Sequence, residues 1–233
     1  LDDPAAGPCG RCANCAPAEA LLTGVSTASE EAARRFLERQ VVVIEPRKKW
    51  AAGAFPTYGW VGGWIDWGLM NERGRALSAW ADDGWGATVA SGKHAGLFSD
   101  ELVKASAKLI RTAWKPEPFP AWVTCIPSLN HPRLVPEFAT RLAAALGLPF
   151  RAAIRKVRST QPQKAMQNSA TQARNLDGAF EVDLDAMHSG PCLLVDDLVD
   201  SKWTMTVAGA LLRQAGCPCV FPFALADSSR ASG

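Results

Sequence analysis

The sequence predicts an α/β protein whose C-terminal part, residues 122–233, is a doubly wound parallel sheet. Two segments, 122–157 and 192–225, each pass from a short apolar run to an amphipathic helix and on to another apolar run. Strands that alternate with helices in this way form parallel sheets with helices on their faces. Three prolines within residues 115–121 form a stiff linker and predict a domain boundary there.

The segment 192–216 contains the clearest strand, loop and helix. Residues 192–195 are apolar without a helical period, which is typical of a strand buried on both faces. From Thr204 the apolar residues recur on one helical face, and Gly216 ends the helix. The loop between them carries Asp196 and Asp197, which can accept hydrogen bonds from two ribose hydroxyls, while the helix N-terminus can hold a phosphate. An ordinary strand–turn–helix with a solvated acidic turn is the alternative.

This segment resembles the ribose-phosphate signature of the type I phosphoribosyltransferases, in which a hydrophobic run and two acids precede a Thr/Ser-Gly-x-Thr loop. The resemblance lies in Val195-Asp196-Asp197, Ser201 and Thr204. Lys202 departs from it, because the family usually has Gly there, and Gly tolerates φ > 0 and a close approach to phosphate. A Lys can instead offer a charge to the phosphate. The resemblance implies a phosphoribosyl pyrophosphate loop made of Asp196, Asp197, Asp200, Ser201, Lys202 and Thr204.

The segment 122–157 repeats the same plan. We expect a strand at 122–126, an exit loop at 127–133, and a helix that starts near Pro136 and ends at Gly147. Residues 150–157 are the next expected strand, parallel to the first after a right-handed crossover. In the last strand, 219–226, Pro222 removes a backbone donor and predicts a position at the edge of the sheet.

Two loops of this part resemble those of the ComF-type phosphoribosyltransferases. The matching residues are Ile126-Pro127-Ser128 with His131-Pro132-Arg133, and Arg158-Ser159-Thr160-x-x-Gln163 with Arg174-Asn175-Leu176 and Gly178-Ala179-Phe180. The resemblance implies a pyrophosphate loop of Pro127, Ser128, Asn130 and His131, and a flexible loop containing Arg158, Gln163 and Arg174. It also implies Mg²⁺ bound together with phosphoribosyl pyrophosphate if the transferase site works.

Positive charge is concentrated in the same region. Residues 138–176 contain seven Lys or Arg and no acid, whereas the whole chain carries a net charge of only +2. Such a surface suits an oligophosphate or a nucleic acid backbone. A solubilising flexible loop is the alternative.

Residues 18–114 are expected to form a small α+β domain of a winged-helix-like, DNA-binding kind. A capping box at Thr27 and Glu30 starts a helix, residues 41–44 are β-branched, and residues 53–68 combine Gly with Trp as in an ordered hairpin. The candidate DNA-binding residues follow the β-branched strand, where the cations can contact phosphates and the Trp can stack on a base. They are Arg47, Lys48, Lys49 and Trp50. A solvated basic turn is the alternative.

Residues 1–17 are expected to be a partial zinc-binding segment. Cys9, Cys12 and Cys15 stand at overlapping C-x-x-C spacing, which aims successive thiolates at one metal. Structural zinc takes four ligands, so we expect the fourth upstream in a longer protein. The remaining cysteines, at 125, 192, 217 and 219, lie in apolar settings and are expected in the core.

Cys9-Gly10-Arg11-Cys12-Ala13-Asn14-Cys15 is similar to the last three ligands of the zinc module in RecQ-family DNA helicases. RecQ-like helicases with a phosphoribosyltransferase-like domain at the C-terminus have the same order of parts. The resemblance implies single-stranded or forked DNA as a partner. It also implies an ATP-dependent motor outside this sequence, which contains no G-x-x-x-x-G-K-[ST] loop.

Two functions of different class follow from these observations. In the first, the chain is the accessory C-terminal region of such a helicase, serving DNA repair or recombination, with the last domain as a binding or regulatory module. In the second, that domain is an active phosphoribosyltransferase. Whether the chain is itself an enzyme stays open, as does any nucleobase or nucleotide ligand. No run of about 18 apolar residues predicts a membrane span, and a cytoplasmic location is expected.

Overall fold

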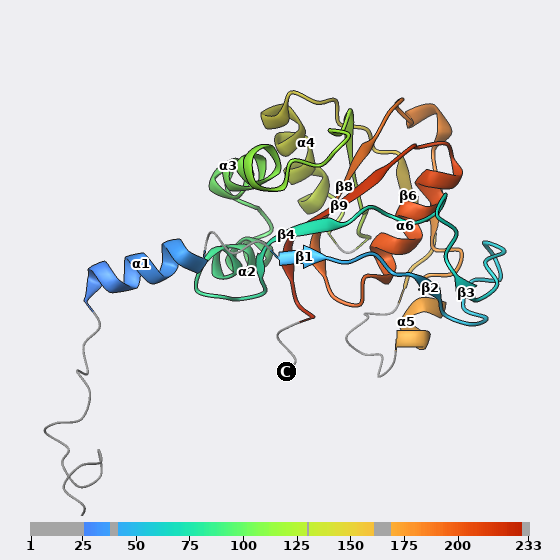
Figure 1. The fold of residues 1–233 in the computed structure, drawn as a ribbon, viewed down its shortest axis with the longest axis horizontal. Helices are drawn as coiled ribbons and strands as arrows, with labels where there is room; N and C mark the ends of the chain where they lie inside the picture. Colours follow the sequence, from blue (N-terminus) through green and yellow to red (C-terminus); the bar gives the residue numbers. More distant parts are fainter. Residues whose placement is uncertain (1–25, 38–41, 130, 161–168, 230–233) are drawn as a thin grey trace, which may run out of the picture.

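A five-stranded sheet forms the centre of the molecule (Figure 1). The computed structural model describes residues 26–37, 42–129, 131–160 and 169–229. The strands lie in the order β1 (Val42–Ile44), β4 (Gly74–Ala79), β9 (Val220–Asp227), β8 (Cys192–Val199) and β5 (Trp122–Cys125). The strands from β4 to β5 are parallel, and β1 pairs antiparallel with β4. The α/β class and the mostly parallel sheet are therefore confirmed.

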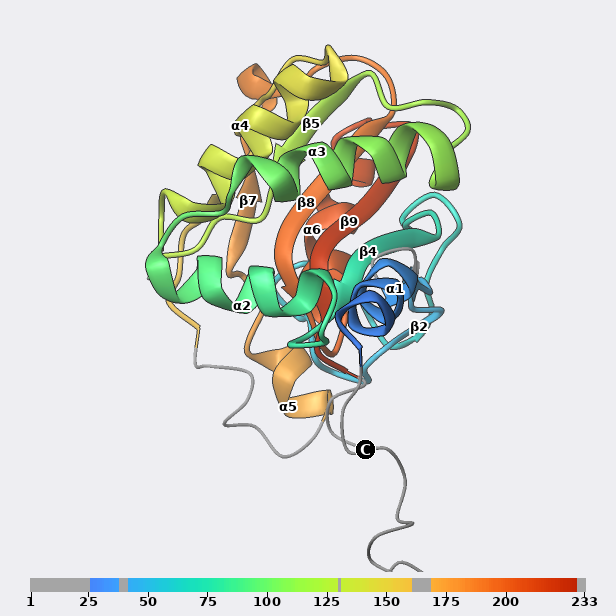
Figure 2. The same ribbon diagram turned by 90° about the vertical axis from the view of Figure 1, so that its left-hand side faces the viewer.

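Helices cover both faces of this sheet (Figure 2). One face carries α2 (Trp85–Ala95), α3 (Asp100–Lys108), the π-helical turn η1 (Leu109–Trp114) and α4 (Leu134–Leu146), and the other carries α6 (Trp203–Gln214). Alternate side chains of β8 face the two helical layers. Leu193 and Val195 pack with α2, α3 and α4, whereas Cys192 and Leu194 pack with α6.

The shorter elements add to the α6 layer and to the rim. They are β2 (Lys49–Trp50) paired with β3 (Gly63–Trp64), β6 (Ile154–Lys156) paired with β7 (Phe180–Val182), α5 (Ser169–Arg174) and the 3₁₀ turn η3 (Leu184–Ala186). Buried side chains of both hairpins share one core cluster with α6. The helix α1 (Thr27–Leu37) has no buried residue and points away from the sheet beside β1 (Figure 1).

The predicted boundary at 115–121 does not separate two cores. Strand β4, which precedes it, lies next to β9 in the same sheet. Leu77 and Leu102 from before the prolines pack in one cluster with Val123 and Leu142 from after them. The reason is that β4 is buried on both faces, so it needs a neighbouring strand and helices on each side. The elements of 42–114 accordingly complete an α/β unit and do not form the expected winged-helix-like domain.

Strand β9 also differs from the prediction, because it is central. It lies between β4 and β8, and all of its residues are buried. Pro222 is tolerated there because the β4–β9 register begins one residue later, at Arg75 opposite Phe223. A proline lacks a single N–H, and at the start of a ladder that loss affects one hydrogen bond at most.

The predicted strand at 150–157 is divided between two partners. Phe150 forms an isolated parallel bridge with Val123, as expected for a crossover connection. The later part, β6, instead turns away and pairs antiparallel with β7. The helix predictions are confirmed: α4 ends at Gly147 with φ of 70°, and α6 ends just before Gly216.

A candidate ligand pocket at the carboxyl ends of the strands

A pocket of about 520 Å³ lies where β5 ends beside β8. Cys125 at the end of β5 pairs with Val195, but β8 continues to Val199 with β9 alongside it. Among the residues that the structure describes, no strand pairs with the last part of β8 on its β5 side, and residues of the loop after β5 line the pocket there. The lining residues are Lys93, Ile126, Pro127, Ser128, Leu129, Lys156, Ser159, Thr160, Leu176, Phe180, Asp196, Asp197 and Thr204.

Three segments singled out in the sequence meet in this pocket. Pro127 and Ser128 come from the loop after β5, Ser159 and Thr160 from the residues after β6, and the two acids from β8. The carboxyl ends of parallel strands are where open α/β sheets bind ligands. The structure thus brings the expected loops together around one cavity.

The acid pair lies within β8 and not in the loop after it. Asp196 pairs with Ala224 in the ladder to β9, which keeps this part of the chain extended. Successive side chains of a strand point to opposite faces, so the two carboxylates leave β8 toward different layers. Asp197 is directed toward the α2 layer, where it forms an ion pair with Lys93.

Asp196 is directed toward the opposite layer. One of its oxygens accepts a hydrogen bond of 2.8 Å from the Asp197 amide. Burial raises the pKa of Asp196 well above its usual value, and the neighbouring Asp197 charge raises it further, against the effect of Lys93. Lys156 lies on this side, where burial lowers its pKa and the Asp196 charge raises it. Its ammonium donates to the Thr160 hydroxyl at 2.8 Å.

Two lysines of the pocket were not among the predicted site residues. Lys93 belongs to α2, in the segment that the sequence predicts as a separate domain, and Lys156 enters the prediction only as one cation of the basic stretch 138–176. No local pattern marks Lys93, because its role depends on the packing of α2 against the sheet. Lys156 could have been noticed as the last residue of the strand that leads into the predicted flexible loop.

The loop between β8 and α6 keeps the backbone that a glycine would favour. Lys202 stands at the N-cap of α6 with φ of 68° and ψ of −3°, in the left-handed region. Its carbonyl accepts hydrogen bonds from the amide and the hydroxyl of Thr206, both at 2.9 Å. A non-glycine residue in this conformation is strained by about 1 kcal/mol. Lys202 therefore adopts the turn conformation that a glycine would favour and differs from a glycine only in its side chain.

Arg47 braces this loop from across the molecule. Its guanidinium lies over the Trp203 ring, 3.7 Å from the centroid, and donates to the Ser201 carbonyl at 2.9 Å. It also donates to the Ser169 hydroxyl at 3.1 Å, which in turn accepts from the Trp203 indole N–H at 2.8 Å. Arg47, half-buried in these contacts, connects the chain after β1 to α5 and to the N-terminus of α6.

The predicted DNA-binding cluster is consequently divided. Trp50 is 7 % exposed and stacks on Trp60 with ring centroids 4.3 Å apart, so its faces are not open to a base. Lys48 and Lys49 are exposed, and Lys49 lies over the Trp64 ring at 4.6 Å. Arg47 and Trp50 are parts of the protein core and its rim, and only the two lysines present charge to solvent.

Several predicted residues do not line the pocket, among them Asp200, Ser201 and Lys202 after β8. His131 is exposed, and its amide donates to the Ser128 hydroxyl at 3.3 Å. Arg158 is held by the carbonyls of Asn175 and Asp177, and Arg174 is exposed on α5. None of these side chains lines the pocket as the structure describes it. Asn130 and Gln163 lie outside the described residues.

The predicted zinc ligands Cys9, Cys12 and Cys15 also lie outside the described residues. Within residues 26–229, apart from the gaps given above, no group of three or more His, Cys, Asp or Glu could hold a metal ion. Three of the other cysteines, at 125, 192 and 217, are buried, and the fourth, at 219, is half-buried. In the same part of the chain no helix is long and apolar enough to cross a membrane.

The acid pair fits Mg²⁺ poorly as it stands. Mg²⁺ is usually held by one or two carboxylates together with ligand phosphates and waters. Here one oxygen of Asp197 is engaged by the Lys93 ammonium and one oxygen of Asp196 by a backbone amide. A divalent ion bound at Asp197 would therefore compete with Lys93.

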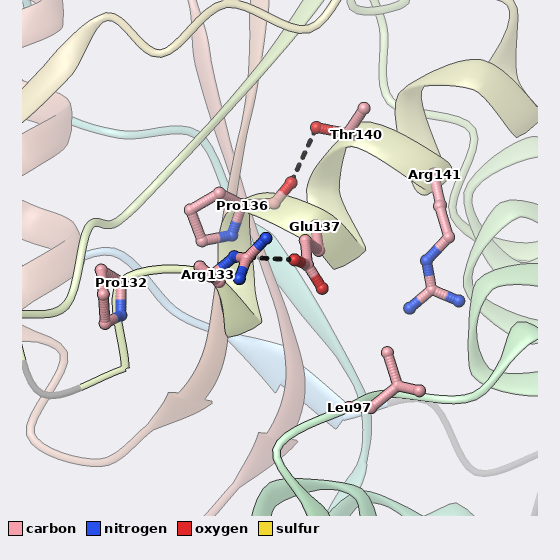
Figure 3. A pocket seen from close by; sticks show the side chains of 7 residues that line it. All are labelled: Leu97, Pro132, Arg133, Pro136, Glu137, Thr140 and Arg141. Carbon is pink, nitrogen blue, oxygen red and sulfur yellow. Dashed lines mark hydrogen bonds and ion pairs between the residues drawn. The ribbon is translucent and has the colours of Figure 1, made fainter.

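A second pocket, of about 620 Å³, lies between the first turns of α4 and Leu97 (Figure 3). Its charged side chains are paired within the protein, Arg133 with Glu137 at 3.4 Å and Arg141 with Asp100 at 2.7 Å. The Thr140 hydroxyl donates to the Pro136 carbonyl at 2.8 Å. Because these groups satisfy one another, we assign the candidate site to the pocket around Asp196 and Asp197.

Comparisons with known proteins add little to this geometry. No protein-family description matches the chain, and no curated protein matches it. Among solved structures, the adenine phosphoribosyltransferase from Leishmania tarentolae is similar over 60 % of this chain and 74 % of that one. The identity is 14 % and the TM-score 0.39, which is too low to support an argument about function.

Proposed function

We propose that the pocket at the ends of β5 and β8 binds a phosphorylated ribose, with phosphoribosyl pyrophosphate as the ligand. The observation that carries the proposal is the meeting of three predicted ligand loops around Asp196 and Asp197. The acids can accept hydrogen bonds from ribose hydroxyls, and Thr204 in the first turn of α6 lines the pocket, where a helix N-terminus favours a phosphate.

The pocket carries both the cations that the phosphates of this ligand need and the acceptors that its ribose hydroxyls need. Lys93 and Lys156 can approach phosphate oxygens, while the two carboxylates recognise neutral hydroxyl groups. Lys202 lies at the start of α6, where its charge can supplement the amides that would face the 5′-phosphate.

Calorimetry of the intact chain with phosphoribosyl pyrophosphate tests this proposal. We expect measurable binding that weakens by about 10-fold or more in the double variant Asp196→Asn and Asp197→Asn, because each charged hydrogen bond contributes roughly 1.5–3 kcal/mol. Glu30→Gln on α1, an exposed acid remote from the pocket, is the matched control and should leave affinity unchanged. Absence of binding by the unmodified protein would overturn the assignment.

An active transferase would use the same pocket and would, in addition, release pyrophosphate when an acceptor is supplied. In that reaction the bond from the ribose anomeric carbon to the pyrophosphate oxygen breaks and a bond to the acceptor forms. Measuring pyrophosphate release with nucleobase acceptors separates this alternative from a binding or regulatory module. Binding without turnover, across the common nucleobases, favours the module.

The wider proposal is that this chain is the accessory C-terminal region of an ATP-dependent RecQ-like DNA helicase. Its support is the cysteine motif at residues 9–15 and the exposed Lys48 and Lys49. We expect a zinc content near one ion in the longer protein and weaker binding to forked DNA when both lysines are changed to Ala. Unchanged affinity for forked DNA would show that these lysines do not bind DNA. Absence of zinc would show that the cysteine motif is not a metal site.

A further inference from the structure

Lys93 is placed to do more than neutralise Asp197. It lies in the last turn of α2, and its ammonium reaches the carboxylate from the side opposite to Lys156. The Lys93 side chain is 31 % exposed and that of Asp197 13 % exposed, so the pair lies at the wall of the pocket and not on the open surface.

The position of this lysine is built into the fold. The Gly92 carbonyl accepts hydrogen bonds from the amides of Gly96 and Leu97, which close the end of α2. A Cβ at Gly92 would come within 2.9 Å of the Leu97 carbonyl and of the Phe98 ring, so this turn is in tight contact with the following loop. The residue next to Gly92 is therefore held where it meets β8.

The chemistry of the ammonium suits a shared role. A lysine has three N–H donors, and its contact with one carboxylate oxygen uses one of them. The others can be offered to an anion that enters the pocket. A divalent ion that binds together with a diphosphate normally supplies the positive charge facing the phosphate oxygens. At Asp197 the Lys93 ammonium already occupies the position that such an ion would take.

We infer that Lys93 supplies the counter-charge for the diphosphate, so that this pocket binds phosphoribosyl pyrophosphate without a divalent metal ion. The inference rests on the proposed ligand and deepens it. Asp197 then acts on the ligand in two ways, through a ribose hydroxyl and by orienting the Lys93 ammonium. Lys156, on the other side of β8, adds a second fixed cation.

The test is calorimetry of phosphoribosyl pyrophosphate with the intact chain, once in EDTA and once in Mg²⁺. We expect the affinity of the unmodified protein to differ by less than about 3-fold between the two buffers, because the Lys93 and Lys156 ammonium groups donate to the diphosphate in place of a metal ion. In EDTA, Lys93→Met should weaken binding by about 10- to 100-fold, the range for losing a hydrogen bond to a charged group. Mg²⁺ should restore part of that loss. Lys104→Met, at an exposed lysine of the neighbouring α3, is the control and should bind as the unmodified protein does.

The outcomes separate this inference from the proposed function. Binding by the unmodified protein that appears only with Mg²⁺ overturns the role of Lys93 and leaves the ligand assignment standing. Binding in EDTA that Lys93→Met does not change also overturns it. No binding in either buffer overturns the ligand assignment and this inference together. The measurements on the unmodified protein do not depend on whether the variant folds.

Discussion

Changing Arg47 to Met tests whether this residue is a structural brace or a DNA contact. The variant keeps an unbranched apolar side chain over Trp203 but loses the charge and the hydrogen bonds to Ser201 and Ser169. The cation–π contact contributes about 1 kcal/mol. Two partly exposed hydrogen bonds from a charged donor contribute about 1 kcal/mol each.

The expected loss is therefore about 2–3 kcal/mol in the free energy of unfolding. For a chain of this size that corresponds to a fall in Tm of roughly 5 to 10 °C. Urea unfolding followed by tryptophan fluorescence measures the first quantity, and thermal unfolding followed by circular dichroism measures the second. Arg47→Lys should lose about half as much, because an ammonium cannot reach both carbonyl and hydroxyl while stacked on the ring.

Lys48→Ala is the matched control, since Lys48 is the exposed neighbour of Arg47. Its free energy of unfolding should change by less than about 0.5 kcal/mol. If Arg47→Met were as stable as Lys48→Ala while DNA binding fell in both, the brace would be refuted and the basic cluster would be a DNA contact after all.

Three further changes test other features of the structure. Lys202→Gly should raise the free energy of unfolding by about 0.5–1 kcal/mol, because glycine removes the strain of φ at 68°; an unchanged or lower value in urea unfolding would contradict that backbone. Trp50→Ala should lower the free energy of unfolding by about 3–5 kcal/mol, as expected for an aromatic ring in a core. A loss well below this range would place the ring at the surface. Because the pKa of Asp196 is raised, the folded state binds the Asp196 proton more tightly than the unfolded state does. The protonated carboxyl therefore contributes to stability at acidic pH, and this contribution is lost as the pH rises above the ordinary carboxyl range. Asp196→Asn should therefore be more stable than the unmodified protein at pH 7, with a difference that shrinks toward pH 4, and a difference independent of pH would argue against the buried carboxyl.

The local patterns of the sequence predicted individual elements well. The apolar run before Asp196 is a buried strand, and the amphipathic segments before Gly147 and Gly216 are helices. These elements depend on periodicity and on end signals that lie within a few residues of each other. The meeting of the loops after β5 and β8 was also predictable, because these parallel strands end at the same edge of one sheet, whereas β6 pairs antiparallel with β7 outside that sheet.

Long-range partners were not predictable in the same way. The prolines at 116–120 stiffen the chain, but they say nothing about whether the segments on either side share a sheet. Pro222 argued for an edge strand, yet a single missing N–H at the start of a ladder leaves a central position open. The basic run of Arg47, Lys48 and Lys49 looked uniform, whereas packing placed Arg47 on Trp203 and left the two lysines exposed.

The sequence by itself determined the strand before Asp196, the acid pair and the helices that end near Gly147 and Gly216, since these follow from the order of neighbouring residues. Only the tertiary structure decided that β4 completes the same sheet and that α2 brings Lys93 to Asp197. The physical reason is that a contact between residues 104 positions apart depends on how whole elements pack, and no short stretch of sequence records that packing.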